Sequence, residues 1–373
     1  MKVPVVSTIN NTAQGSEILA ALVAVVRRSY LKLAVSCVLV YLMMKVCLNV
    51  SGLYGPDMNT SLGRLSVVHN ISEAAAKYYN DAPTNNETPG VAGVPEDVVS
   101  DSNISHVPEQ KLCPVIPPNL VGYIPTNMDV RSLDDVEDEF PDVMPGGHFR
   151  PKECTSRHRV AILIPYRNRA QHLNIFIYNI HRVLARQQID YGVFVIEQGD
   201  SKAFNRAKLL NIGYLESTAL YDYQCFVFHD IDLVPVDDRN VYTCPQRPRH
   251  MSVTIDSHSG VPYGLMFGGV SALSKEIMLR VNGYSNIYWG WGGEDDDMSF
   301  RLTHINQTIL RRPGNIARYK SLKHKHGEKN PARFGILKDW KARYKTDGLN
   351  NVRYKIMDMA FRKLYTWILA DLR

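Results

Sequence analysis

Residues 160–164 read Val-Ala-Ile-Leu-Ile, a short apolar run that Pro165 follows directly. A run of this length without polar residues is typical of a strand that is buried on both faces, as in a parallel sheet. We expect the strand to end at Pro165, because proline has no N–H to donate to a neighbouring strand.

Strand and helix patterns alternate after this run. Residues 173–184 carry apolar side chains at helical spacing, and residues 191–196 form a second apolar run. Residues from about 202 to 218 have a helical pattern, and residues 225–228 form a third apolar run. This alternation predicts an open, mostly parallel α/β sheet, in which ligands bind beyond the carboxyl ends of the strands.

Polar groups stand at two of these strand ends. Residues 166–169 (Tyr-Arg-Asn-Arg) and 204–206 (Phe-Asn-Arg) supply aromatic and guanidinium groups that can stack on a base and neutralise phosphate. Asp230 and Asp232 follow the third strand. Alternate residues of an extended chain point the same way, so these carboxylates are expected to converge on Mg²⁺ or Mn²⁺. Taken alone, an Asp-x-Asp sequence is more often a solvated turn.

Residues 288–297 read Tyr-Trp-Gly-Trp-Gly-Gly-Glu-Asp-Asp-Asp. The two indoles offer flat apolar faces that suit sugar rings, and glycine lets backbone and ligand come close. The four adjacent carboxylates fit the acidic first turn of a helix that runs to Ile305, where they complement the helix dipole. We favour a carbohydrate site in which one of these carboxylates also acts as an acid/base group.

The segment Lys-His-Lys-His-Gly contains His324 and His326. A lone histidine is usually structural or solvated. Here a neutral imidazole can complete a Mn²⁺ site with Asp232.

The composition is that of a globular protein. The chain has 373 residues, a net charge of +6 and 45% hydrophobic residues, which allows one large catalytic domain and accessory segments. The sequence has no arginine-rich arm, zinc-finger spacing or aromatic RNA-binding signature, so we expect no nucleic-acid partner. A mildly basic protein still suits an anionic small molecule such as a nucleotide sugar.

The first 112 residues differ from the rest. Residues 31–53 are mostly apolar after a basic segment, which predicts an uncleaved transmembrane signal anchor and a cytosolic tail at residues 1–30; a cleaved or interfacial segment is the alternative. Residues 54–112 are polar and predict a flexible glycosylated stem. Residues 113–373 then form a lumenal catalytic domain. Asn-x-Ser/Thr sequons stand at Asn59, Asn70, Asn86, Asn103 and Asn306.

Four cysteines lie beyond the predicted anchor: Cys113, Cys154, Cys225 and Cys244. An even number in an oxidising compartment favours disulfides. Three pairings are possible.

Together these motifs resemble the β-1,4-galactosyltransferase family, including its invertebrate β-1,4-N-acetylgalactosaminyltransferase members. The resemblance implies a GT-A-like, Rossmann-type sheet flanked by helices in a Golgi membrane protein of type II topology. It also implies inverting, Mn²⁺-dependent transfer from a UDP-sugar in β-1,4 linkage onto terminal GlcNAc. It extends from about Cys113 to the C-terminus and is carried by residues 164–169, 204–206, 226–232, 248–250, 267–274, 282–284, 289–297 and 330–334.

The resemblance assigns roles to individual residues. Asp295 is the implied general base, with Glu294 and Trp291 beside the reacting sugars, and Asp232 and His324 are the implied metal ligands. The implied donor site comprises Pro165, Tyr166, Arg167, Asn168, Arg169, Phe204, Asn205, Arg206, Ile231, Asp232 and Met266. The implied acceptor site comprises Tyr263, Gly269, Trp291, Gly293, Asp295, Asp296, Arg333, Phe334 and Leu337. The implied disulfides are Cys113–Cys154 and Cys225–Cys244.

Two positions depart from the family pattern. Vertebrate galactosyltransferases carry a tyrosine where this chain has Met266, and that hydroxyl crowds the N-acetyl group of UDP-GalNAc. Methionine is flexible and lacks the hydroxyl, so we expect GalNAc as the donor, with galactose as the alternative. Ser321 replaces a methionine metal ligand, and its harder oxygen favours tolerance of Mg²⁺; His326 is the other candidate third ligand.

Two other functions remain open. A non-catalytic Golgi lectin or partner subunit would keep the fold, but the intact Asp230, Asp232 and Asp295 argue against it. A metal-dependent nucleotide-sugar hydrolase would release UDP whether or not an acceptor is present. Acceptors of either kind, glycoprotein or glycolipid, fit the sequence, as does a requirement for a helper protein.

Overall fold

The computed structural model describes residues 111–373, except residues 131, 259–261 and 326. The predicted cytosolic tail and membrane anchor, and all but the last two residues of the predicted stem, lie outside this range. Among the described residues, the helices are too short or too polar to cross a membrane.

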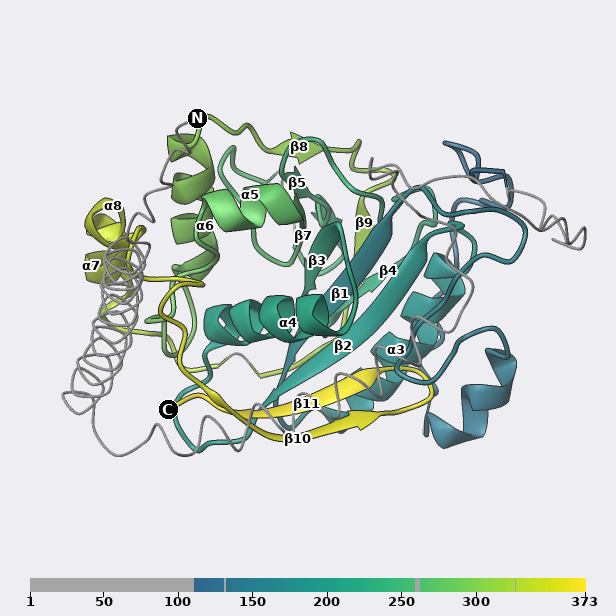
Figure 1. The fold of residues 1–373 in the computed structure, drawn as a ribbon, viewed down its shortest axis with the longest axis horizontal. Coiled ribbons are helices and arrows are strands. Elements are labelled where there is room, and N and C mark those ends of the chain that lie inside the picture. Colours follow the sequence, from purple (N-terminus) through teal and green to yellow (C-terminus); the bar gives the residue numbers. More distant parts are fainter. Residues whose placement is uncertain (1–110, 131, 259–261, 326) are drawn as a thin grey trace, which may run out of the picture. The chain divides into compact units, whose positions relative to one another are not determined.

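One sheet of eight strands organises the described residues (Figure 1). Its four central neighbours, β11, β2, β1 and β3, run parallel to one another. Antiparallel pairs flank them, β10 with β11 on one side and β7 with β3 and β5 on the other, and β8 pairs in parallel with β5. The order across the sheet is β10 (Lys355–Phe361), β11 (Thr366–Asp371), β2 (Asp190–Gln198), β1 (Arg159–Tyr166), β3 (Cys225–His229), β7 (Val270–Ser274), β5 (Arg249–His250) and β8 (Leu310–Arg311).

Two long helices cover opposite faces of this sheet. The connection β1–α3–β2 steps across the sheet in one direction and β2–α4–β3 steps back past β1, so right-handed crossovers place α3 (Ala170–Leu184) and α4 (Arg206–Leu220) on opposite faces. Figure 1 shows α4 in front of the sheet and α3 behind it. The core strand β1 is therefore covered on both sides, and residues 160–164 have no exposed surface. The predicted mostly parallel α/β sheet is confirmed.

Shorter elements complete the fold. A 3₁₀ helix η2 (Asp134–Glu139) precedes β1, and α5 (Lys275–Arg280), α6 (Glu294–His304), α7 (Arg333–Lys338) and α8 (Trp340–Arg343) follow β7. A second sheet of three strands has the order β4 (Leu233–Pro235), β9 (Arg318–Ser321) and β6 (Thr254–Ile255). Since β9 pairs with β4, it brings the segment that contains His324 next to the end of β3.

Two predicted boundaries were wrong. Strand β1 does not end before Pro165 but continues to Tyr166. It pairs with β3 only as far as Leu163, so beyond that point it has one neighbour and a residue without an N–H is tolerated. The second helix begins at Arg206, not near residue 202, because the Asn205 side chain caps it by accepting a hydrogen bond from the Lys208 N–H at 2.9 Å.

The disulfides Cys113–Cys154 and Cys225–Cys244 are both formed, as the resemblance implied. The first ties the start of the described chain to the segment before β1. In the described part of the chain, a group of three possible metal ligands lies at His158, Cys225 and Cys244. Because its two sulfurs are bonded to each other, they are not available as thiolate ligands.

Candidate active site

The two segments predicted to bind a nucleotide lie side by side after β1 and before α4. The Arg167 guanidinium donates to the Lys202 carbonyl at 2.7 Å and lies 5.3 Å from the centre of the Phe204 ring. Asn168 adopts φ 53°, which the short amide side chain tolerates, and Arg169 is the N-cap residue of α3. The Tyr166 hydroxyl accepts from the Arg169 N–H at 3.3 Å. These contacts fix a surface of aromatic and cationic groups at the carboxyl ends of the parallel strands.

Asp230 and Asp232 do not lie on extended chain, as the sequence pattern assumed, and their carboxylates have different partners. The Leu233 N–H donates to the Asp230 carbonyl at 3.2 Å, so the two aspartates lie in a turn between β3 and β4. Asp230 pairs with Arg206, Nε to Oδ1 at 2.5 Å. Asp232 faces His324, with Oδ2 and Nδ1 at 3.1 Å. Of the two aspartates, therefore, only Asp232 lies beside the other predicted metal ligand, His324.

The surroundings of Asp232 and His324 fit a divalent transition metal. One carboxylate and one imidazole within 3.1 Å of each other are the kinds of ligand that Mn²⁺ accepts. A cavity of about 400 Å³ opens beside them, lined by residues 168–172 and 323–325. The His172 Nδ1 is buried there without a hydrogen-bond partner. Ser321 ends β9, whereas His326 lies outside the described residues, so the third ligand stays a prediction.

Arg206 joins the turn to helix α6. Its guanidinium pairs with Asp230 and lies 3.7 Å from the Glu294 Oε1, and it is only 14% exposed. Burial raises the pKa of Glu294 to about 7, with Asp295 adding to the rise and Arg206 opposing it. The Glu294 Oε2 is buried without a partner in the described structure. A buried acceptor of this kind is positioned to take a hydrogen bond from a ligand hydroxyl.

Glycines set the position of the Asp295 carboxylate. Gly292 and Gly293 have φ of 106° and 98°, a conformation that L side chains rarely adopt, and they turn the chain into α6. A Cβ on Gly268 would lie 2.1 Å from the Asp295 Oδ2. The absence of a side chain at Gly268 therefore makes the space that the carboxylate occupies. Burial raises the pKa of Asp295, and Asp296 adds to the rise while Arg206 opposes it.

For Asp295, the general base that the resemblance implies, we expect the acidic limb of the kcat/KM profile to lie above the ordinary pKa of an aspartate. A general base works as the carboxylate, and a raised pKa means that protonation begins at higher pH as the solution is acidified. In Asp296→Asn the neighbouring charge is lost, so the limb should move to lower pH. Initial rates from pH 4.5 to 8.5 test this. An acidic limb at the ordinary aspartate pKa, unmoved by the substitution, would contradict it.

Exposed aromatic rings surround the carboxylates. Trp291 is 53% exposed, and its backbone is held by residues 328–330, with hydrogen bonds of 2.8 and 3.0 Å. The Arg333 guanidinium lies 5.9 Å from the Trp291 ring and 4.3 Å from the ring of Phe334, which is 69% exposed on α7. The exposed Tyr263 hydroxyl donates to the Asp296 Oδ1. Such rings offer apolar faces with polar rims, which suits binding of a sugar.

Comparison with known proteins shows the family. The model for the N-terminal region of glycosyl transferase group 7 matches residues 113–245, and that for the N-terminal domain of galactosyltransferase matches residues 249–325. β-1,4-Galactosyltransferase 1 of Mus musculus is 44% identical over 303 residues, which cover 78% of this chain and 75% of the relative. The chain belongs to the β-1,4-galactosyltransferase family. β-1,4-Galactosyltransferase 2 of Mus musculus is 42% identical over 315 residues, or 82% of this chain and 84% of the relative.

A solved β-1,4-galactosyltransferase has a similar fold. The catalytic domain of Drosophila β1,4-galactosyltransferase 7, as a mutant in complex with manganese, UDP-Gal and xylobiose, superposes with a TM-score of 0.52 at 28% identity. The alignment covers 58% of this chain and 94% of that one. The likeness confirms the GT-A-like fold. With the family relationship, it makes the chain a UDP-sugar hexosyltransferase.

Some residues of this family member have structural roles that the sequence did not indicate. Asn205 is fully buried, and its side chain bonds to the Lys208 N–H and the Asn286 carbonyl. The indole of Trp289 lies within 5.4 Å and 5.7 Å of the Lys202 and Lys208 ammonium groups, unlike the exposed Trp291. The two indoles of the motif therefore have different surroundings.

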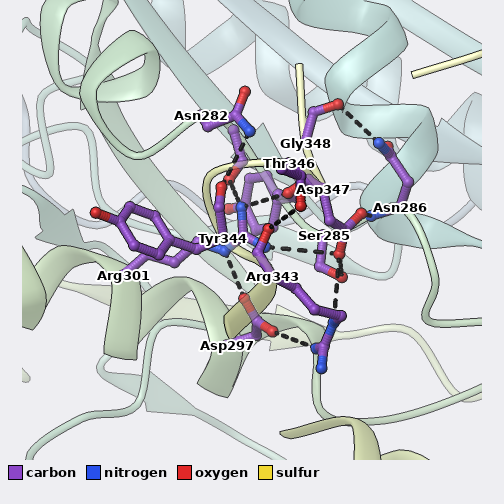
Figure 2. A network of polar contacts seen from close by, with 12 residues as sticks. Asn282, Ser285, Asn286, Asp297, Arg301, Arg343, Tyr344, Thr346, Asp347 and Gly348 are labelled. Atoms are coloured by element: carbon purple, nitrogen blue, oxygen red, sulfur yellow. Dashed lines mark hydrogen bonds and ion pairs between the residues drawn. The ribbon is translucent and has the colours of Figure 1, made fainter. Parts of the chain in front are cut away.

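A buried polar network fixes helix α6 in this β-1,4-galactosyltransferase (Figure 2). Asp297, the last of the four acids, accepts from the Arg301 Nε at 2.6 Å, and neither side chain is exposed. Arg301 Nη1 also donates to the carbonyls of Asp347 and Gly283, at 2.8 and 3.1 Å. The Tyr288 hydroxyl donates to Asp297 at 3.0 Å. The acidic run is thus divided: its first residues face the site, and Asp297 holds the helix in place.

Proposed function

We propose that the chain transfers GalNAc from UDP-GalNAc, in β-1,4 linkage with inversion, onto terminal GlcNAc of glycoprotein or glycolipid glycans. The observation that carries the donor assignment is Met266, a flexible thioether without a hydroxyl, directly before the Phe-Gly-Gly segment in which Gly268 packs against the Asp295 carboxylate. Transfer of galactose from UDP-Gal is the second candidate, since the solved Drosophila relative holds UDP-Gal.

Asp295 is the general base in this proposal. Its carboxylate removes the proton of the acceptor 4-hydroxyl as that oxygen attacks the anomeric carbon from the face opposite UDP. The bond to the UDP oxygen breaks in the same step, so the product has the inverted configuration. Glu294 and Asp296 orient hydroxyl groups of the sugars, and Trp291 separates the donor from the acceptor.

Asp232 and His324 would hold Mn²⁺, which when bound neutralises charge on the departing diphosphate. The solved Drosophila relative contains manganese, which supports this choice. Residues 166–169 and 204–206 would bind the base and the diphosphate. We also propose that the predicted signal anchor holds the enzyme in the Golgi membrane with its catalytic domain in the lumen, a location that fits glycan acceptors.

Transfer of radiolabelled sugar to a GlcNAc acceptor tests the proposal. We expect transfer from UDP-GalNAc with Mn²⁺ and loss of transfer with a chelator, partly restored by Mg²⁺. No transfer from either donor would favour the lectin or partner subunit. Release of UDP at a rate unaffected by acceptor would favour the hydrolase.

We expect Met266→Tyr to shift donor preference toward UDP-Gal. A hydroxyl beside the N-acetyl group disfavours GalNAc by about 1–3 kcal/mol, or about 10–200-fold in the ratio of kcat/KM values. Competition between the two donors in one reaction measures this ratio. Met266→Leu, which adds no hydroxyl, is the matched control. An unchanged ratio in Met266→Tyr would show that position 266 does not select the sugar.

A further inference from the structure

We propose that Arg311 and His250 form a clamp that sets the backbone of residues 263–268, and that through this backbone they position Met266 for donor selection and make room for Asp295. Neither residue reaches the reacting atoms, so both are positioning residues. The role in donor selection rests on the proposed function. The clamp itself does not.

Arg311 holds one end of the segment. It lies on β8, at the edge of the main sheet. Its Nη2 lies within hydrogen-bond distance of three backbone carbonyls, those of Tyr263 at 3.2 Å, Gly264 at 3.1 Å and Met266 at 2.7 Å. The side chains of residues 263–265 are exposed and contribute little packing. One guanidinium therefore supplies much of the polar contact that defines this backbone.

His250 holds the other end. The Arg311 Nε donates to the His250 Nδ1 at 3.2 Å, and since arginine is always a donor, the His250 Nδ1 must be the acceptor. The proton then lies on Nε2, which donates to the Gly268 carbonyl at 3.1 Å. His250 is fully buried, and burial together with Arg311 lowers its pKa to about 4, so this tautomer persists at neutral pH.

The clamp ends at the general base. Gly268, whose carbonyl His250 fixes, is the residue against which the Asp295 carboxylate packs. Ser252 reinforces the same point by donating to the Gly268 carbonyl at 3.3 Å and accepting from the Val270 N–H at 3.0 Å. A shift of this backbone would move the Met266 side chain relative to the donor and the space available to Asp295 together.

The segment that Arg311 holds also contacts the proposed acceptor site. The Tyr263 hydroxyl in this segment donates a hydrogen bond to Asp296, one of the proposed acceptor-site residues. Arg311 therefore links the donor-selecting residue and an acceptor contact through one side chain. The sequence alone does not suggest this, because Arg311 is one of two adjacent arginines outside every recognised motif.

Arg311→Ala in the full-length protein tests the clamp. Amide hydrogen exchange should rise in peptides that cover residues 262–270 and stay unchanged in α3 and α4. The preference for UDP-GalNAc over UDP-Gal should fall about 5–10-fold, with a smaller fall in kcat, and millimolar guanidinium should restore part of the preference. Affinity for UDP with Mn²⁺, measured by calorimetry, should not change, since that site lies at Asp232 and His324.

Arg247→Ala is the matched control, because this exposed arginine bonds to Thr308 and touches no residue of the segment. It should change neither exchange nor donor preference. Normal exchange of residues 262–270 in Arg311→Ala would overturn the clamp, whether or not the wild type is active. Faster exchange with an unchanged donor ratio would overturn the role in selection. A wild type that transfers neither sugar would instead refute the proposed function.

Discussion

Asp295→Asn should lower kcat by about 10²–10⁴-fold, the contribution typical of a positioned general base. The amide has the shape of the carboxylate, and its oxygen can still accept from the Asp296 N–H, a bond of 3.1 Å in the wild type. It cannot remove a proton from the acceptor hydroxyl. The loss should therefore appear in kcat, while UDP and Mn²⁺ bind as before.

Initial rates and calorimetry with UDP and Mn²⁺ measure these two quantities. Glu276→Gln is the matched control, since that carboxylate is exposed on α5 and 78% accessible. It should leave both quantities unchanged. Turnover of Asp295→Asn near the wild-type rate would remove Asp295 from the role of base.

Arg301→Met should destabilise the fold by about 3–5 kcal/mol, the usual cost of removing one partner of a buried ion pair. Asp297 would keep the Tyr288 hydroxyl at 3.0 Å and the more distant Arg343 Nη2 at 3.5 Å. Methionine keeps much of the volume, but the Asp297 carboxylate loses its 2.6 Å contact at a place with no solvent. The carbonyls of Gly283 and Asp347 lose a donor as well. Denaturant unfolding of the oxidised protein measures the loss.

Arg280→Met provides the comparison. This arginine pairs with Glu276 on the same helix, four residues apart as Arg301 and Asp297 are, but the two side chains are 44% and 78% exposed. Exposed pairs contribute about 0–1 kcal/mol. Equal destabilisation by the two substitutions would show that burial of the Arg301 network does not decide its strength.

Local sequence patterns predicted the centre of the fold. Strands β1, β2 and β3 are apolar runs, and α3 has clear helical spacing, so each could be recognised from a few neighbouring residues. The β5 and β8 strands have two residues each, and nothing in their sequence distinguishes them from loops. β5 forms because β7 offers an edge to pair with, and β8 in turn pairs with β5, so both strands depend on tertiary structure.

The candidate site, like the fold, was predictable where local sequence motifs define it. The carboxylates of α6 and the polar strand ends stand in recognisable motifs. The different partners of Asp230 and Asp232 were not predictable, because Arg206 and His324 are brought to them by α4 and β9. In the sequence Arg301 looks like an ordinary polar residue of a helix. It is fully buried, and its guanidinium donates to the distant Val281, Gly283 and Asp347 carbonyls.

The Phe-Gly-Gly turn limits how this enzyme can change its sugar. A side chain at Gly268 would collide with the Asp295 carboxylate. Gly269 has a φ of 75°, and a Cβ added there would lie 2.6 Å from the Ser252 hydroxyl oxygen. Phe267 is buried in the interior. Among residues 266–269, position 266 is thus the one at which a substitution is expected to disturb the structure least. If Met266 selects the donor as proposed, a change of donor preference in this enzyme should therefore require only a single codon.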